Sequence, residues 1–303
     1  MTRTGTSARP TALALAVSTV PTAALLSLSA PAREAHAAET PEAVAGKGFL
    51  YFMGLARQHV MYRETGSLLP FESRASGASP VLVTGALYAL SERLLMSLDN
   101  ETTFYPDRAS ETWTATGPTF DGFVLTSPVL QRNGFSLQQS KTQVLGHYRV
   151  QGQTFGVGGA ALRTQSFKRY SFTPGPDNAV ATPTDTTVEE SIAELLLDAG
   201  VALESEQVRG QATHYSLRAT SSVPVWRRLT NTTAPQAAFS GQRGFDLAVE
   251  GRYSRALADK VHAGVWGSWS MARRGQQTLG GTLEMPRSRL DCLGCGVELL
   301  WKL

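Results

Sequence analysis

Acidic and basic side chains recur at alternate positions in several segments of the chain, a spacing that could build rows of ion pairs. Between Glu190 and Glu204, the even-numbered positions include Glu194 and Asp198, and the odd-numbered positions are almost all apolar. Alternate side chains of an extended strand point to the same face, so these carboxylates would share one face. Other segments with this alternation supply further acids and bases. The predicted charge network consists of Glu194, Asp198, Glu204, Asp246, Glu250, Arg252, Arg218, Lys141 and Arg149, with Glu298 and Lys260 following the same pattern.

Two kinds of chemistry fit paired charges on one face of a sheet. The charges could line a pore that selects small solutes, or they could close a narrow interior with salt bridges. Buried acids and bases are tolerated when they are paired. Because both signs occur together, the closed interior is favoured.

Histidines are the candidates for acid–base catalysis. His59, His147, His214 and His262 are scattered, and none stands beside an aspartate in the sequence. A histidine could act as a general base only if another strand brought a carboxylate to it. No spacing typical of a catalytic site is present, so we predict no catalytic residue and interpret these histidines as hydrogen-bonded interior side chains.

The two cysteines, Cys292 and Cys295, have the spacing C-x-x-C. In an oxidising compartment this pair is a candidate structural disulfide, provided that the segment bends, because residues three apart on a straight strand face opposite sides. A metal site would need further ligands at a fixed spacing, and none is evident. The run Gly156, Gly158 and Gly159 lacks the strand–helix context of a nucleotide site. We therefore predict no metal and no cofactor.

Strands are the elements that must position these residues. The alternation of Glu190–Glu204 is repeated in several other segments, although a helix remains an alternative there because Glu, Leu and Ala favour helices. Soluble β-sandwiches also alternate, so alternation alone does not identify the fold. The alternating segments lie around residues 94–101, 141–150, 214–220, 245–253 and 260–271.

Connection lengths indicate a particular β fold. Short links are expected at 91–93, 151–153, 205–210 and 256–259, and long polar stretches at 65–79, 104–134, 173–187, 230–242 and 274–287. The alternation of long and short connections predicts ten antiparallel strands. Small bacterial barrels have even strand numbers, short turns on one side and longer loops on the other. Eight or twelve strands remain open because the segments 49–63, 81–90 and 155–168 have no clear phase.

The first 37 residues have the features of a cleaved export signal. Arg3 and Arg9 precede an apolar stretch, and Ala35-His36-Ala37 provides a small-x-small cleavage motif. Residues 38–303 would then form the mature domain, with a formal charge near +1 rather than +3. This charge gives no support for nucleic-acid binding. No mature stretch reaches the ~18 apolar residues of a spanning helix, so a membrane location would require a closed barrel.

The last eight residues also alternate, with Val297, Leu299, Trp301 and Leu303 on one face. This segment resembles the C-terminal assembly signal of bacterial outer-membrane β-barrels, with Gly296, Leu299 and Trp301 at the matching positions. Two residues depart from that pattern: Leu303 stands where Phe or Trp is usual, and Gly294 replaces a polar residue. The resemblance implies an all-β, closed transmembrane barrel in the cell outer membrane, with membrane lipid and the barrel-assembly machinery as partners.

Several functions are compatible with such a barrel. The first is a role in envelope structure, surface interaction or limited passage of small solutes, with a charged, plugged lumen. A ten-stranded barrel of this length is also similar to the omptins, whose family uses an acidic pair and a His-Asp dyad near the extracellular rim, although the local patterns of that family are missing. An omptin-like or lipid-modifying enzyme and a secreted soluble β protein are therefore the alternatives. A histidine beside a carboxylate in an open cleft would favour the enzyme.

Overall fold

The computed structural model describes residues 48–180, 186–205 and 212–302, and these residues form strands and their connections. The predicted signal peptide, residues 1–37, and the final Leu303 lie outside the described residues. No helical segment in the described ranges has the length and apolarity needed to cross a bilayer.

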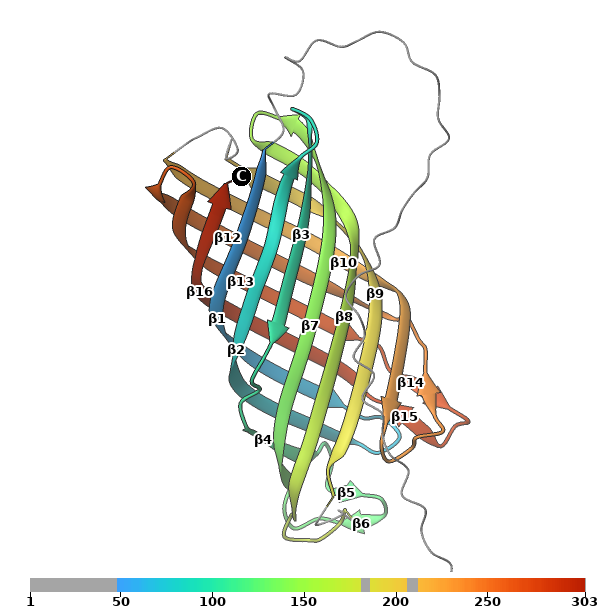
Figure 1. The fold of residues 1–303 in the computed structure, drawn as a ribbon. Helices are drawn as coiled ribbons and strands as arrows, with labels where there is room; N and C mark the ends of the chain where they lie inside the picture. Colours follow the sequence, from blue (N-terminus) through green and yellow to red (C-terminus); the bar gives the residue numbers. More distant parts are fainter. Residues whose placement is uncertain (1–47, 181–185, 206–211, 303) are drawn as a thin grey trace, which may run out of the picture. The chain divides into compact units, whose positions relative to one another are not determined.

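Ten strand positions form a ring of antiparallel pairings (Figure 1). β1 (Phe49–Thr65) pairs with β2 on one side and with β16 on the other, so the ring of pairings returns to its first strand. β3 and β4 share one position, each pairing with both β2 and β7. The remaining strands of the ring are β2 (Phe71–Ala89), β3 (Leu94–Thr103), β4 (Ala109–Ala115), β7 (Val129–Gln151), β8 (Thr154–Pro174), β9 (Val188–Glu204), β10 (Thr213–Asn231), β12 (Gly244–Ala258), β13 (Val261–Arg274) and β16 (Arg287–Lys302).

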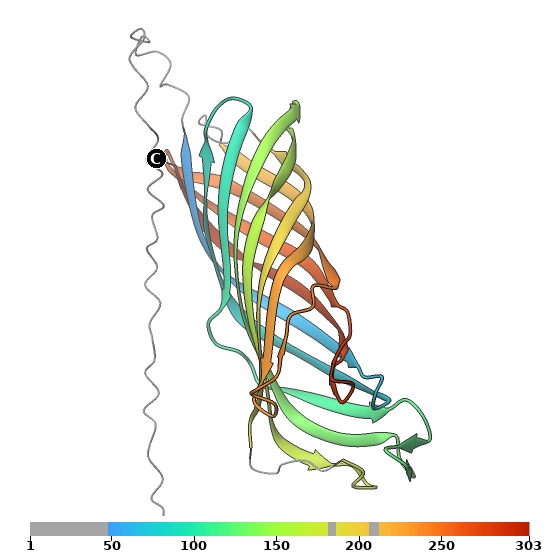
Figure 2. The same ribbon diagram turned by 90° about the vertical axis from the view of Figure 1, so that its right-hand side faces the viewer.

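Five very short strands lie in the connections between the strands of the ring. They are β5 (Thr119–Phe120), β6 (Phe123–Val124), β11 (Ala238–Phe239), β14 (Gln277–Leu279) and β15 (Leu283–Met285). We call the end that carries Phe49 and Lys302 the terminus end, and the opposite end, with the hairpins β5–β6 and β14–β15, the loop end (Figures 1 and 2). Long connections at the loop end and short turns at the terminus end agree with the predicted alternation of long and short connections.

Each strand presents one face to the interior and the other to the surroundings. On β9, Glu194 and Asp198 are buried inside, whereas Leu197 and Val201 are exposed outside. β12 has the same arrangement, with Asp246 pointing inward and Val249 pointing outward. A soluble sandwich buries its apolar faces, so an apolar exterior around a polar interior indicates a barrel that faces lipid.

The exposed apolar side chains form what we call the apolar belt, around the terminus half of the barrel. Aromatic residues border the belt: Tyr51 is paired with Trp301, and Tyr215 with Tyr253, near the terminus end. Outward-facing Trp269 marks the border toward the loop end. Tyr and Trp favour the two membrane–water interfaces, so this pattern is typical of a membrane-spanning zone. The belt includes Leu55, Leu98, Val144, Leu162, Leu197, Val201, Leu217, Val249, Val265 and Val297.

Beyond the apolar belt, the outer face of the wall becomes polar, and here the predicted boundaries between strands and loops were wrong. The expected loop at 65–79 is the five-residue connection 66–70, because β2 begins at Phe71. The expected loop at 104–134 contains β4, the hairpin β5–β6 and the start of β7. A strand that stands clear of lipid needs no apolar outer face, so its alternation is weak and its composition is similar to that of a loop.

Candidate functional site

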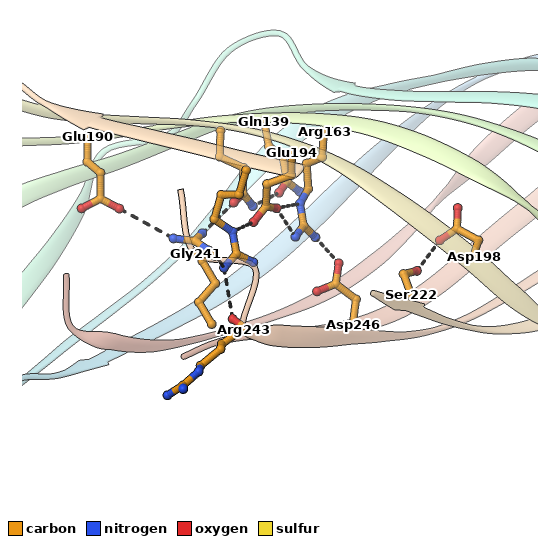
Figure 3. A network of polar contacts seen from close by, with 12 residues as sticks. Gln139, Arg163, Glu190, Glu194, Asp198, Ser222, Gly241, Arg243 and Asp246 are labelled. Carbon is orange, nitrogen blue, oxygen red and sulfur yellow. Dashed lines mark hydrogen bonds and ion pairs between the residues drawn. The ribbon is translucent and has the colours of Figure 1, made fainter. Parts of the chain in front are cut away.

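A buried carboxylate at the centre of the lumen holds two arginines from neighbouring strands. Glu194 of β9 has a fully buried side chain and accepts hydrogen bonds from Arg163 of β8 and Arg227 of β10 (Figure 3). The Nε–Oε distances are 2.8 Å for Arg163 and 2.5 Å for Arg227. Arg163 also pairs with Asp246 of β12. This central cluster therefore ties four consecutive strands together across the interior.

The central cluster continues toward the loop end. Arg227 donates from Nη1 to the backbone carbonyls of Gly241 and Arg243, at 2.8 and 3.1 Å, which anchors the connection between β10 and β12. Arg274 of β13 lies 3.6 Å from Glu190 and donates to the side-chain oxygen of Gln165 at 2.7 Å.

A second cluster, which we call the loop-side cluster, lies nearer the loop end. Arg169 of β8 reaches across the lumen to Glu64 of β1 at 2.7 Å and to Glu111 of β4 at 2.8 Å. Glu111 is fully buried and also accepts hydrogen bonds from Asn133 and Ser73, at 2.7 and 3.0 Å. Two carboxylates thus share one guanidinium, and the neutral donors Asn133 and Ser73 complete the contacts of Glu111.

A third cluster, which we call the terminus-side cluster, lies nearer the terminus end. Arg218 of β10 contacts Asp99 of β3 and Glu250 of β12, both at 2.8 Å. Arg252 contacts Glu250 at 2.8 Å and Glu298 of β16 at 2.9 Å. The guanidinium of Arg252 also lies 3.7 Å from the ring centre of Phe52, a cation–π contact.

Five members of the predicted network occur in these clusters: Glu194, Asp246, Glu250, Arg252 and Arg218. Four others have different surroundings. Asp198 accepts hydrogen bonds from Gln143 and Ser222 instead of from a cation. Lys141 lines a small cavity beside Glu101, and Arg149 lies 5.2 Å from the ring centre of Phe155. Glu204 lies beside His147.

Lys260, which was expected inside, occupies the turn between β12 and β13 and is exposed. It stands at the end of the strand, where the inward and outward alternation no longer applies.

Sequence analysis missed several arginines and acids that build the clusters. Arg163 lies in the segment 155–168, whose phase was unclear, and Arg169 directly follows it; β8 leaves the apolar belt after Leu162 and then carries polar residues on both faces. Arg227 follows an irregularity between Pro224 and Trp226 that shifts the alternation of β10 by one residue. Proline in a strand is a signal for such a bulge and could have identified the shift.

His147 lies close to a serine and an acid, in the manner of a hydrolytic triad. Its Nε2 is 3.0 Å from the hydroxyl of Ser97, and its Nδ1 is 3.8 Å from Glu204. Within the described residues, it is the one histidine within 4.0 Å of a carboxylate. The adjoining cavity has a volume of about 40 Å³, enough for a few water molecules and no larger group. The three residues therefore lie beside a cavity far smaller than a typical small-molecule site.

A larger cavity of about 400 Å³ opens at the loop end, and we call it the loop-end cavity. Its walls include Leu69, Leu229 and the parallel rings of Phe71 and Trp113, whose centres lie 4.5 Å apart. Polar atoms reach it from Glu64, Arg169, Glu190 and Glu284. An apolar cavity with a few charged groups is typical of a small-molecule site.

The candidate disulfide is not formed. Cys292 and Cys295 are both free, the first buried inside and the second exposed outside. β16 runs unbroken through both positions, so residues three apart point to opposite faces and their sulfur atoms cannot meet.

The C-terminal segment completes the ring of pairings. Leu299 faces outward, as expected, and Gly296 pairs with Ala56 of β1. A Cβ atom at Gly296 would lie 2.3 Å from the carbonyl oxygen of Leu55, so glycine permits the close approach of the last strand to the first.

No protein-family model matches the chain, and no curated protein matches it by sequence. Solved structures do match. The outer membrane protease OmpT from Escherichia coli is 8% identical, with a TM-score of 0.57 over 85% of this chain and 96% of the protease. OprG from Pseudomonas aeruginosa is 11% identical, with a TM-score of 0.31 over 84% of this chain and 95% of OprG. The translocator domain of NalP from Neisseria meningitidis is 10% identical, with a TM-score of 0.33 over 83% and 88%.

At such low identity, the match to the protease concerns the fold and not the activity. It agrees with the ring of pairings, the polar interior and the apolar belt. The predicted all-β fold is confirmed: the chain has the antiparallel, ten-stranded fold of the bacterial outer-membrane β-barrel proteins.

Proposed function

We propose that the protein is a non-conducting barrel of the bacterial outer membrane that acts at the cell surface through its loop-end cavity. The observation that carries this proposal is the series of three Arg–carboxylate clusters, which link separate strands across the lumen at three levels. Two cavities, one beside the terminus-side cluster and one beside the central cluster, have volumes of about 40 and 80 Å³.

A pore is disfavoured by the pairing of the charges. A passing ion would have to displace guanidinium–carboxylate contacts such as Arg163–Glu194, whose members are buried and hold each other in place. Breaking one buried pair exposes an uncompensated charge and costs several kcal/mol. The same pairs make the lumen a rigid support for the strands of the loop end.

The topology of the barrel supports the export route and the orientation that we propose. Cleavage after Ala37 would release the mature chain in the periplasm, and the barrel-assembly machinery would insert it into outer-membrane lipid. Both ends of the ring then lie on the periplasmic side, and the longer connections lie outside, as is usual in bacterial barrels. The loop-end cavity accordingly opens to the medium.

The loop-end cavity suits a small ligand with an apolar body. Aromatic and aliphatic side chains form most of its wall, so burial of an apolar group would be favourable. Three carboxylates and one guanidinium line it, so a ligand with a cationic or hydrogen-bond-donating group fits better than an anion.

Single-channel recording tests the closed lumen. The wild-type barrel, refolded into a planar bilayer, is expected to give no conductance steps. The double substitution Arg218→Ala with Glu250→Ala removes one cation and one anion, leaves Arg252 with Asp99 and Glu298 as its partners, and is expected to increase ion leakage. Steady conductance by the wild-type barrel would contradict the proposal.

Membrane fractionation and gel mobility test the location separately. A folded barrel should fractionate with the outer membrane and migrate differently before and after boiling. A protein that stays soluble and shows no mobility shift would contradict the outer-membrane proposal and favour a secreted β protein.

A further inference from the structure

Four arginines face outward at directly paired positions on four adjacent strands. Arg74 of β2 pairs with Arg63 of β1, Arg63 with Arg289 of β16, and Arg289 with Arg273 of β13. We call this row the arginine ladder. With strands ~4.8 Å apart, its backbone positions span roughly 14 Å.

Direct pairing of like charges is unfavourable in a sheet, and it occurs here at three successive strand pairs. The arginines are not buried, since the exposed fractions of the Arg63, Arg74 and Arg289 side chains are 55%, 70% and 44%. A barrel wall has no structural need for such a row, because glutamine or threonine would satisfy the strand equally well.

Carboxylates neutralise the ladder only in part. Glu72 contacts both Arg63, at 2.6 Å, and Arg74, and Asp291 contacts Arg289 at 2.6 Å. Arg273 makes no ion pair within the described ranges and lies 5.8 Å from the ring centre of Phe245. Four guanidinium groups therefore face two carboxylates, which leaves a local excess of positive charge.

The part of the ladder on β13 and β16 lies nearest the apolar belt, whereas on β1 the exposed Arg57 and His59 separate Arg63 from Leu55. On β13, Val265 and Trp269 are outward-facing members of the membrane zone, and Arg273 follows on the same face. On β16, Val297 and Leu293 face lipid, and Asp291 and Arg289 follow. A lipid whose chains cover these apolar side chains would place its headgroup against the ladder.

We propose that the arginine ladder binds the phosphate-bearing headgroup of a lipid in the leaflet at the loop end. The guanidinium fork matches the geometry of phosphate oxygens and binds them in a bidentate manner. A headgroup phosphate would supply the negative charge that Glu72 and Asp291 leave missing. This inference rests on the proposed membrane location but not on the closed lumen or the loop-end cavity.

Thermal unfolding in vesicles of defined composition tests the inference. The refolded protein would be compared in phosphatidylcholine alone, in phosphatidylcholine with phosphatidic acid, and in phosphatidylcholine with oleic acid at equal negative charge. We expect a higher Tm with phosphatidic acid than with oleic acid. Inorganic phosphate added to phosphatidylcholine vesicles should not reproduce the shift. An equal shift with oleic acid, or with inorganic phosphate, would overturn the proposal.

Two double variants separate the ladder from general charge. Arg63→Gln with Arg289→Gln removes the two central members and is expected to weaken binding of phosphatidic acid by roughly 100-fold, about tenfold for each charge-assisted contact. In phosphatidylcholine alone the same variant should be at least as stable as the wild type, because repulsion is reduced. Arg132→Gln with Arg228→Gln removes the same charge from outward positions off the ladder and should keep the binding.

Equal losses in the two variants would overturn the proposal. Failure of the membrane-location test would be visible separately, as a protein that does not enter any of the vesicles.

Discussion

Arginine, not lysine, makes the cross-lumen contacts, and its geometry explains why. A planar guanidinium presents five donors in a fixed fork, so one side chain can bind carboxylates from two strands. Arg169 does so with Glu64 and Glu111, and Arg218 with Asp99 and Glu250. Lys141, a compact point charge, lines a cavity instead. The closed lumen therefore depends on the shape of the cation as well as on its charge.

Glu194 is the residue whose loss should cost most. The substitution Glu194→Gln removes the charge that Arg163 and Arg227 share in a buried site. We expect the free energy of unfolding to fall by about 3 kcal/mol, because two buried guanidinium groups lose their common counter-charge. Urea unfolding of the refolded barrel in vesicles measures this effect.

The matched control for Glu194→Gln is Asp259→Asn in the exposed turn between β12 and β13. This substitution removes the same charge at the surface and should change stability by less than about 0.5 kcal/mol. Equal effects of the two substitutions would show that Glu194 does not hold the central cluster.

The two cysteines should behave as independent thiols. An uncharged maleimide should label Cys295 in the folded barrel, because this side chain faces outward between Leu293 and Val297 and beside Arg57, whereas Cys292 should react only after unfolding. Mass spectrometry of the labelled protein distinguishes the two sites. A mobility change on reduction, or one intact disulfide in the mass, would contradict the separation of the two faces.

Individual lumen residues could be predicted where the outer face is apolar. Glu194 and Asp246 stand out because their strand neighbours, such as Leu197 and Val249, face lipid. Glu64 and Glu111 did not stand out, since their strands carry polar residues on both faces at the loop end. Ion-pair partners could not be predicted at all. Arg163 and Asp246 are distant in sequence, and the pairing depends on a register that local alternation does not specify.

At the scale of elements, glycines let β8 approach β7 closely and β9 approach β10 closely. Gly159 and Gly200 both face the interior on neighbouring strands. A Cβ atom at Gly159 would lie 2.0 Å from the carbonyl oxygen of Val144, and one at Gly200 would lie 2.1 Å from that of Ala219. The glycine run of β8 thus serves strand packing, as the absence of a strand–helix context suggested.

Two adjacent glycines of β8 should respond in opposite ways to alanine. Gly159→Ala places a methyl group against the backbone of β7, and we expect a loss of about 1–3 kcal/mol through overpacking. Gly158→Ala meets its nearest atom at 3.7 Å, an ordinary contact, and should be neutral or slightly stabilising. Urea midpoints of the two variants test the difference, and equal midpoints would contradict the close approach.

At the scale of the whole molecule, the barrel has two zones. The terminus half carries the apolar belt, and the loop half has polar residues on its outer wall, such as Arg57 and Gln138. Sequence analysis predicted the ring and its ten strands, because the connections alternate in length. It did not predict how far the strands continue beyond the apolar belt, because strands outside lipid lose the alternation that marks the belt.

Site-directed labelling tests the orientation of these zones. In a Cys295→Ser background, Thr282→Cys should react with an impermeant maleimide on intact cells, because Thr282 lies in the exposed hairpin β14–β15 at the loop end. Lys260→Cys, in the turn between β12 and β13 at the terminus end, should react only after the outer membrane is permeabilised. The reverse pattern would show the opposite orientation.

The pairing of β1 with β16 determines when the ring of strands can close. Residues of β1, such as Leu50, pair with Lys302 and its neighbours in β16, which follows all the other strands of the ring in the chain. Until then β1 and β16 would be open edges, with backbone groups ready to pair with any other chain. The ring therefore cannot close before β16 has been made. A chain truncated before β16 is expected to expose both edges and to aggregate.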